Sequence, residues 1–373
     1  PYDATHMGHA NTYVAFDLLH RAWRDAGLDV HYVQNATDVD DPLLVRARET
    51  GVDWRQLADE QIALFHDDMV ALRVLPPRDY VGAVESIELV TDMIAALDSA
   101  GAIYPMSSGE PDLYFRQAVD EKFLSVSGLT RDEAMPLFAE RGGDPDRPGK
   151  RDAFDSLLWL QQRPGEPGWE SPYGKGRPGW HIECAAIVGK YLGTAIDVQG
   201  GGSDLIFPHH EMSASQARVA TRAEFARSYV HAGMVGLDGE KMSKSKGNLV
   251  LVSKLRADGV DPMAIRMALL TQHYRSDWMW TDRLLADAEQ QLARWREAVR
   301  LESGLDPTPA IADMRAALRN DLDAPAALAA FDAWAGASLA MDSDDDAAPG
   351  MMARAADTLL GISLADPGPG PRA

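Results

Sequence analysis

The sequence is poor in cysteine and has no long apolar run. Its 373 residues include one cysteine, Cys184, which excludes an internal disulfide framework and is typical of a protein from a reducing cytoplasm. No apolar stretch approaches the roughly 20 residues that a membrane-spanning helix needs. No signal peptide is recognisable, and because the sequence starts at Pro1 without a methionine we expect upstream residues to be missing.

Positive charge is also scarce. The formal net charge is −21, which argues against a general nucleic-acid-binding surface. An acidic protein can still carry a local basic groove. No lysine follows Lys254, and residues 302–373 carry 12 acidic side chains against 4 arginines. This C-terminal region is therefore a poor candidate for binding an RNA backbone.

The chain is long enough for two or three units with a sizeable core. Up to about residue 260 the patterns predict alternating strands and helices, which is typical of an α/β fold. Beyond residue 261 only helices are expected. The predicted helices cover residues 6–26, 42–51, 53–74, 86–100, 131–140, 180–193, 208 onward, 263–271, 283–301, 311–318, 323–340 and 351–360. The predicted strands cover residues 30–34, 102–104, 112–116, 156–160, 195–198 and 228–231.

Two histidines flank a glycine at the predicted start of the first helix: His6, Met7, Gly8 and His9. The free N–H groups of a helix start, a glycine that permits close approach and two imidazole donors together suit a polyphosphate. A four-residue pattern is short, and a plain helix cap is the alternative interpretation.

The segment 176–211 contains the most concentrated chemistry. A helix starting near Trp180 carries Cys184, a buried strand follows, and a turn at residues 200–202 leads to Ser203 and Asp204. Pro208 is expected to begin a helix that carries His209. Because Cys184 and His209 flank one strand, they can converge at its end as zinc ligands that leave a position open for substrate. The alternatives are a small core cysteine and a histidine that only starts a helix.

A late loop combines two lysines with hydroxyl groups. It reads Lys241, Met242, Ser243, Lys244 and Ser245, and such a loop can neutralise charge as a pyrophosphate leaves. A lysine-rich surface loop is the alternative. The turn at residues 140–145 is rich in glycine and proline, and nothing in its chemistry demands catalysis.

Three motifs follow one another along the chain in an order that resembles the class I aminoacyl-tRNA synthetases. They are the His6–His9 turn, the turn of Gly202, Ser203 and Asp204, and the 241–245 loop. Trp180, Cys184 and the Pro208, His209, His210 run resemble their cysteine-activating branch. Within that branch the chain is most similar to the mycothiol ligases. The similarity lies in the amino-acid sequence of residues 1–9, in the 140–145 turn and in the acidic helical C-terminal end. The resemblance implies ATP-dependent ligation of L-cysteine to the amine of glucosaminyl-inositol, with Mg²⁺ accompanying ATP, in a cytoplasmic monomer that does not use tRNA.

The resemblance also implies a fold and a set of roles. We expect a Rossmann-like nucleotide-binding fold in residues 1–104 and 176–250, with a connective insertion at 105–175, a helical domain at 251–365 and a tail at 366–373. His6, His9, Lys241 and Lys244 are implied to stabilise the phosphates. The cysteinyl-adenylate is implied to contact Thr12, Asn35, Ala36, Thr37, Trp180, Gly202, Ser203, Asp204 and Val235.

Cys184 and His209 are implied to bind one zinc ion. The third ligand of the family is a cysteine in a Cys-Gly-x-Thr segment directly before the proline that is Pro1 here, so it is expected upstream of this sequence. Cysteinyl-tRNA synthetases place a glutamate four residues after the histidine, and this position holds Ser213. Three protein ligands with a vacant fourth position are the mycothiol-ligase pattern.

Two alternatives stay open at this point. A cysteinyl-tRNA synthetase would share the adenylation chemistry, but Ser213, the acidic lysine-free end and the absence of room for an anticodon-binding domain argue against it. A non-catalytic nucleotide-binding relative is the other alternative, and the intact histidine and lysine motifs argue against that.

Overall fold

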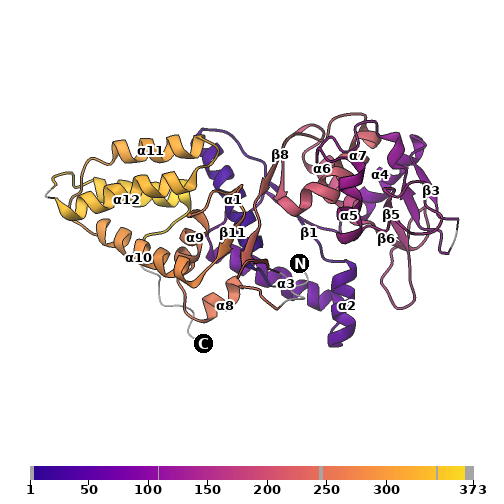
Figure 1. The fold of residues 1–373 in the computed structure, drawn as a ribbon, viewed down its shortest axis with the longest axis horizontal. Coiled ribbons are helices and arrows are strands. Elements are labelled where there is room, and N and C mark those ends of the chain that lie inside the picture. Colours follow the sequence, from indigo (N-terminus) through magenta and orange to yellow (C-terminus); the bar gives the residue numbers. More distant parts are fainter. Residues whose placement is uncertain (1–3, 108, 243–246, 342, 366–373) are drawn as a thin grey trace. The chain divides into compact units, whose positions relative to one another are not determined.

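A computed structural model describes residues 4–107, 109–242, 247–341 and 343–365 (Figure 1). The chain forms two compact units, each assembled from separate stretches of sequence. The first contains Pro1–Tyr2, His31–Ile62 and Pro77–His231, and the second contains Asp3–Val30, Ala63–Pro76 and Ala232–Ala373. One of the points where the chain passes from one unit to the other falls within helix α3 (Trp54–Ala71). The segment bounds expected from the sequence remain a prediction.

The first unit contains three small groups of paired strands. Strands β1 (Val33–Ala36) and β2 (Asp79–Gly82) pair in parallel. An antiparallel sheet has the order β3 (Ile103–Pro105), β4 (Leu113–Phe115), β5 (Ser156–Gln161) and β6 (Gly176–Pro178). Strand β7 (Ile196–Gly202) lies beside β8 (Ala226–Ala232), whose last residue falls in the second unit.

Three mutually packed helices cover the strands of this unit: α4 (Ile87–Ser99), α6 (Trp180–Tyr191) and α7 (Glu211–Thr221). Their apolar side chains join those of β4 and β5 in one buried cluster. Helix α2 (Asp41–Thr50) is capped by Asp40 and ends at Gly51, which has a left-handed backbone. Helix α5 (Arg131–Glu140) starts with a Thr130–Glu133 capping box.

The second unit is mainly helical. Helix α1 (Met7–Asp25) packs on α9 (Pro262–Leu270), and both α10 (Asp282–Ala298) and α11 (Thr308–Arg319) pack on α12 (Ala324–Ala340) (Figure 1). Apolar side chains from all of these helices share one large core. Further helical segments among the described residues are α8 (Val252–Ala257), α13 (Ala348–Ala355) and the π-helical turn Ala356–Leu360.

A buried ion pair fixes α1 within this unit. Asp17 of α1 accepts hydrogen bonds from Arg21 at 2.7 Å and from Arg266 of α9. Arg266 is fully buried and also donates to the backbone carbonyls of Leu360 and Leu72 at 2.6 and 2.8 Å. Since each charged group has hydrogen-bonding partners, the pair can remain ionised inside the core.

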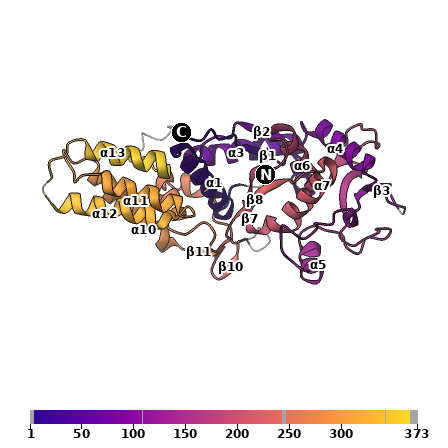
Figure 2. The ribbon, with the colours of Figure 1, turned by 90° about the horizontal axis from the view of Figure 1, so that it is seen from above.

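The structure confirms the predicted α5 residue for residue, and α1, α2 and α4 to within one or two residues at each end. Several short elements were missed: strands β2 and β6, helix α8 and the three strands of a further small sheet. Strand β11 (Trp278–Trp280) pairs in parallel with β9 (Val235–Leu237), and β10 (Glu240–Lys241) lies on the other side of β9. Figure 2 labels β10 and β11. The prediction that only helices follow residue 261 is therefore wrong. The predicted tail at 366–373 lies outside the described residues, and none of the described helices is long and apolar enough to cross a membrane.

Candidate active site

The two N-terminal histidines open helix α1. His6 is the N-cap residue, and its Nδ1 accepts a hydrogen bond from the Gly8 N–H at 3.0 Å. The rings of His6 and His9 stack with their centroids 4.0 Å apart. A Cβ atom on Gly8 would lie 2.9 Å from the His6 ring, so only glycine leaves room for this cap. The capping interpretation is confirmed for His6, and the same turn presents two imidazoles at a helix N-terminus.

Backbone contacts hold this turn in place within the second unit. The Met7 N–H donates to the Val250 carbonyl at 2.9 Å, and the Val252 N–H donates to the Thr5 carbonyl at 2.9 Å. Thr12 donates from its hydroxyl to the Gly8 carbonyl at 3.2 Å. The start of α1 is therefore tied to the segment that follows the lysine loop.

The other candidate residues of this unit lie on or after the small β9–β10 hairpin. Val235 is buried in β9, and the backbone of Lys241 pairs with Gly236 at the end of β10. Lys244 lies outside the described residues. The structure therefore gives the backbone position of one of the two predicted phosphate-binding lysines.

In the first unit, Asn35 and Ala36 end strand β1 and Thr37 follows directly. The next carboxylate, Asp38, accepts a hydrogen bond from the Val84 N–H at 3.0 Å, and burial raises its pKa. A Cβ on Gly82 would come within 2.6 Å of the Asp38 carboxylate. The carboxyl ends of β1 and β2 are thus closely packed. Ligands of parallel sheets bind at the carboxyl ends of the strands, so this is where a ligand is expected.

The start of α6 meets the predicted metal-binding histidine. The Trp180 ring stacks on the His209 ring at 4.3 Å between centroids, with an interplanar angle of 18°. The Nδ1 atoms of His181 and His209 are 3.1 Å apart. Trp180 is 43% exposed whereas His209 is 4% exposed, so the indole covers a buried imidazole. Trp180 and His209, which are predicted to serve substrate and metal, are therefore in contact.

Burial controls the charge of these side chains. It lowers the pKa of His181 to about 4 and holds the pKa of His209 well below its usual value. Burial also raises the pKa of the Cys184 thiol to about 12, with a smaller contribution from the neighbouring Glu183 carboxylate. Without a cation, the site therefore holds neutral imidazoles and a protonated thiol at neutral pH.

The described residues contain no group of three His, Cys, Asp or Glu side chains close enough together to hold a metal ion. Cys184 lies one helical turn beyond His181 on α6, and α6 packs against the π-helical segment Ile206–His210. Cys184 and His209 thus belong to elements that contact each other, and their convergence as zinc ligands stays a prediction. The predicted third ligand is not part of this sequence.

Two local predictions in this segment were wrong. Strand β7 continues through Gly202 instead of turning at residues 200–202, and Ser203–Leu205 forms one 3₁₀ turn. Pro208 does not begin a regular helix, because Ile206–His210 is a π-helical turn interrupted by an extended Phe207, and α7 starts at Glu211. Gly201 explains the close packing, since a Cβ there would lie 2.9 Å from Leu205 and 3.0 Å from His210.

A second histidine pair was missed by the sequence reasoning. His210 Nδ1 and His231 Nε2 are 2.8 Å apart, and the Gln199 side-chain amide lies 3.4 Å from the other ring nitrogen of His210. Burial lowers the pKa of His210 to about 3 and that of His231 to about 4, and the Asp204 carboxylate acts against the shift at His231. His231 lies at the end of a predicted strand, and this position was the feature of the sequence that could have indicated the His210–His231 pair.

Comparisons with known proteins identify the family. Residues 1–290 match the family described as tRNA synthetases class I (C) catalytic domain. The chain is 62% identical over 365 residues to the L-cysteine:1D-myo-inositol 2-amino-2-deoxy-alpha-D-glucopyranoside ligase of Kribbella flavida, covering 98% of this chain and 88% of that protein. This chain belongs to that ligase family. The ligase of the same name from Thermomonospora curvata is 61% identical, with coverage of 98% and 88%.

The fold of this ligase-family chain is that of the class I synthetases. A solved structure of Mycobacterium tuberculosis methionyl-tRNA synthetase in complex with methionyl-adenylate aligns with a TM-score of 0.70, at 17% sequence identity. The alignment covers 98% of this chain and 90% of that one. The predicted α/β class I synthetase fold with a helical C-terminal part is therefore confirmed.

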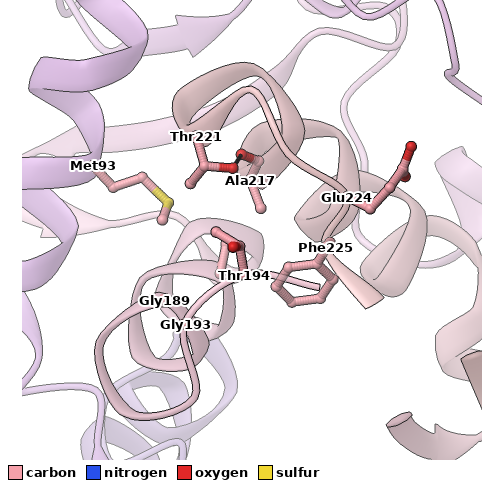
Figure 3. A pocket seen from close by; sticks show the side chains of 9 residues that line it. Met93, Gly189, Gly193, Thr194, Ala217, Thr221, Glu224 and Phe225 are labelled. Carbon is pink, nitrogen blue, oxygen red and sulfur yellow. Dashed lines mark hydrogen bonds between the residues drawn. The ribbon is translucent and has the colours of Figure 1, made fainter. Parts of the chain in front are cut away.

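One pocket of this ligase-family chain is lined by none of the candidate residues (Figure 3). Gly189 and Gly193 line it at the end of α6, and Thr221 and Phe225 line it at and just after the end of α7. Trp180 and His209 lie at or before the starts of these two helices. The lining also includes Ala185, which directly follows Cys184 in the middle of α6.

Proposed function

We propose that this chain joins L-cysteine to the amine of glucosaminyl-inositol through a cysteinyl-adenylate, in an ATP-dependent step of mycothiol synthesis. The observation that carries this proposal is the identity of 62% over 98% of the chain with a ligase whose name specifies cysteine and the amino sugar. The histidine and lysine motifs required for adenylation are all present in the sequence.

The first half-reaction forms the adenylate. The cysteine carboxylate attacks the α-phosphorus of ATP, and the bond to the leaving pyrophosphate breaks. We assign His6 and His9, at the N-terminus of α1, to hydrogen bonds with the phosphates. Lys241 and Lys244 neutralise the charge that develops on the pyrophosphate, and Mg²⁺ accompanies ATP.

The second half-reaction transfers cysteine. The free amine of glucosaminyl-inositol attacks the adenylate carbonyl, the new C–N bond forms and AMP leaves with the electrons of the broken C–O bond. A proton must leave the attacking nitrogen, and we assign no residue to accept it. We assign Asp204 to the ribose hydroxyls, because a carboxylate accepts two hydrogen bonds. The other residues assigned to the adenylate are Thr12, Asn35, Ala36, Thr37, Trp180, Gly202, Ser203 and Val235.

Zinc binding is part of the proposal. The donor types fit the ion, since the buried His209 is a neutral imidazole, as ligation requires, and Cys184 is a thiol within the same pair of packed elements. Cys184 and His209 would hold the ion. When bound, zinc would favour the sulfur of cysteine over the hydroxyl of serine, which shape alone rejects only modestly.

The test is which acceptor releases AMP. With ATP and L-cysteine present, glucosaminyl-inositol should drive AMP release and transcripts of tRNA should not. The class I tRNA-synthetase domain match keeps cysteinyl-tRNA synthetase as the second candidate. Efficient formation of cysteinyl-tRNA, with no response to the amino sugar, would make that candidate the correct one.

A further inference from the structure

The turn at residues 140–145 has an arrangement that its sequence did not reveal. Helix α5 ends at Glu140, and Gly142 has a φ of 89°, in the left-handed region that favours glycine. A Cβ on Gly143 would lie 2.6 Å from the Phe138 ring. The chain therefore folds tightly back over α5, and Arg141 stands at the point where it turns.

Arg141 donates to two backbone carbonyls far along the chain. Its Nη1 lies 2.9 Å from the Asp204 carbonyl oxygen and 2.6 Å from that of Phe207. Phe207 is buried and extended, with φ −138° and ψ 133°, so its carbonyl falls outside the surrounding helical ladder. Within the described part of the chain, the Arg141 guanidinium thus donates to backbone carbonyls of a segment more than 60 residues away.

The two carbonyls lie at the start of, and within, the segment that connects two proposed binding residues. Asp204 is assigned to the ribose and His209 to the metal ion, and residues 205–208 connect them. The segment is irregular, since a 3₁₀ turn is followed directly by the interrupted π-helical turn. A single guanidinium nitrogen that bonds both carbonyls restrains the spacing of this segment where no regular helix does.

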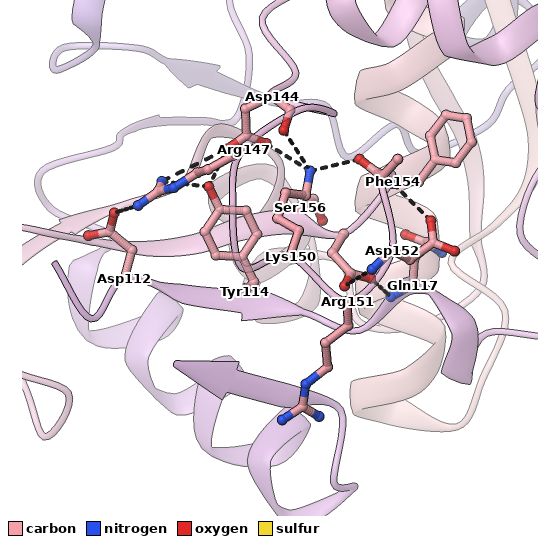
Figure 4. Close-up of polar contacts among 12 residues, drawn as sticks. Asp112, Tyr114, Gln117, Asp144, Arg147, Lys150, Arg151, Asp152, Phe154 and Ser156 are labelled. Atoms are coloured by element: carbon pink, nitrogen blue, oxygen red, sulfur yellow. Dashed lines mark hydrogen bonds and ion pairs between the residues drawn. The ribbon is translucent and has the colours of Figure 1, made fainter. Parts of the chain in front are cut away.

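Polar contacts hold Asp144, which lies three residues after Arg141 (Figure 4). Asp144 accepts hydrogen bonds from the Tyr114 hydroxyl and from Lys150 Nζ, the latter at 2.8 Å. Lys150 also donates to the Ala153 carbonyl at 2.7 Å, and its side chain is 3% exposed. Phe138 of α5 packs against Phe207, with ring centroids 6.5 Å apart. The turn is thus anchored to strand β4 and to the segment that Arg141 contacts.

We propose that Arg141 is a positioning residue for cysteine activation, and that it acts by holding Asp204 and His209 at the separation that binding requires. The proposal rests on the function assigned above. Mutation of a group that orients a binding residue without touching the ligand commonly lowers affinity or activity by about 10- to 100-fold. We therefore expect the Arg141→Ala variant to raise KM for both cysteine and ATP about 10-fold or more.

The experiment compares Arg141→Ala and Arg141→Lys with a matched control, Arg163→Ala. Arg163 belongs to the same insertion and donates to Asp112 and to the Gln161 carbonyl, away from residues 204–209. Cysteine-dependent exchange of pyrophosphate into ATP gives KM and kcat, and hydrogen exchange of the amides of residues 206–211 in the free protein reports on the segment. The alanine variant should raise both KM values and accelerate this exchange, the lysine variant should do so less, and Arg163→Ala should do neither.

The outcomes separate this inference from the proposed function. If the parent protein shows no cysteine-dependent exchange, the proposed function is wrong, and unchanged amide exchange in Arg141→Ala would show that the arginine does not hold the segment. If the parent is active and Arg141→Ala lowers only kcat, or alters KM no more than Arg163→Ala does, Arg141 has only a structural role. Should the alanine variant fail to fold, Arg141→Lys against Arg163→Lys decides by the same KM comparison.

Discussion

The buried histidines of the candidate site carry no charge at neutral pH. Burial lowers the pKa of His181 and His231 to about 4, so both are neutral above that value. Neutral imidazoles can bind a metal ion or accept a proton, but they cannot offset the negative charge of a leaving pyrophosphate. That charge must be met by other groups, and the sequence offers the lysines of the 241–245 loop.

Lys244→Ala should therefore slow cysteine-dependent pyrophosphate exchange by about 10²- to 10³-fold, which is the usual loss for one transition-state charge partner. Steady-state exchange measurements with saturating cysteine and ATP give this ratio. Lys254→Ala, at an exposed position on α8, is the matched control and should leave the rate unchanged. An unaltered rate in Lys244→Ala would remove this lysine from the mechanism.

Cys184 is a residue whose charge depends on a bound cation. Its pKa is about 12 because burial disfavours the thiolate, whereas zinc coordination deprotonates a thiol. Cys184→Ala should therefore lower both the zinc content of the purified protein and its cysteine-dependent exchange. Elemental analysis and the exchange assay measure the two effects, with Ser213→Ala as control. Full activity and unchanged zinc in Cys184→Ala would make this cysteine an ordinary core residue.

At the scale of elements, the contact between α6 and α7 organises the first unit's candidate residues. Ser213 of α7 is buried and donates from its hydroxyl to the His181 carbonyl on α6 at 2.9 Å. This is the position where the sequence departs from the cysteinyl-tRNA synthetase pattern, which has glutamate there. The hydroxyl therefore joins the two helices whose starts meet at Trp180 and His209.

Removing this contact tests its value. Ser213→Ala should cost about 1 kcal/mol in the free energy of unfolding, the usual net worth of one neutral hydrogen bond, and should leave cysteine activation intact. Ser213→Glu should cost more, because a larger, ionisable side chain must fit a site that is 1% exposed. Urea unfolding of both variants gives these values. A glutamate variant as stable as the parent would show that the site has room for a carboxylate.

Regular elements were predictable wherever local signals were strong. Thr130 and Glu133 form the capping box that begins α5, and Asp40 and Gly51 bound α2, so both helices could be located from the sequence. Strand β11 has only three residues and depends on pairing with β9, which a local pattern cannot reveal. The glycines at 200–202 indicated a turn, but pairing with β8 keeps them in a strand.

The candidate site was predictable where residues act through a motif and not where they act through distant contacts. His6 could be proposed from a four-residue pattern that includes Gly8. Its helix cap is a 3.0 Å hydrogen bond from the Gly8 N–H to His6 Nδ1, which joins residues only two positions apart. Arg141 contacts residues 63 and 66 positions away, and His210 meets His231 across 21 positions. Such pairs are set by tertiary packing, so no spacing in the sequence identifies them.

At the scale of the whole molecule, charge limits the choice of partner. A net charge of −21 repels a polyanion, and the 12 acidic residues of the stretch 302–373 lie in the part of the chain without lysine. Glucosaminyl-inositol is small and carries no phosphate, so its binding does not require neutralising a backbone. The choice between an amino sugar and tRNA is therefore also a choice between weak and strong dependence on salt.

This dependence gives the last prediction. A protein that neutralises several phosphates loses affinity steeply with salt, with a log–log slope of about −0.7 for each phosphate contact to a single strand. AMP release driven by glucosaminyl-inositol should instead change little when salt rises from about 50 to 200 mM, a range in which nucleic-acid complexes weaken by orders of magnitude. Tenfold excess tRNA should neither stimulate nor inhibit it. The assay follows AMP at each salt concentration, with and without tRNA. Inhibition by tRNA that disappears at high salt would reveal a basic groove that the overall charge conceals, and would reopen the assignment of the acceptor.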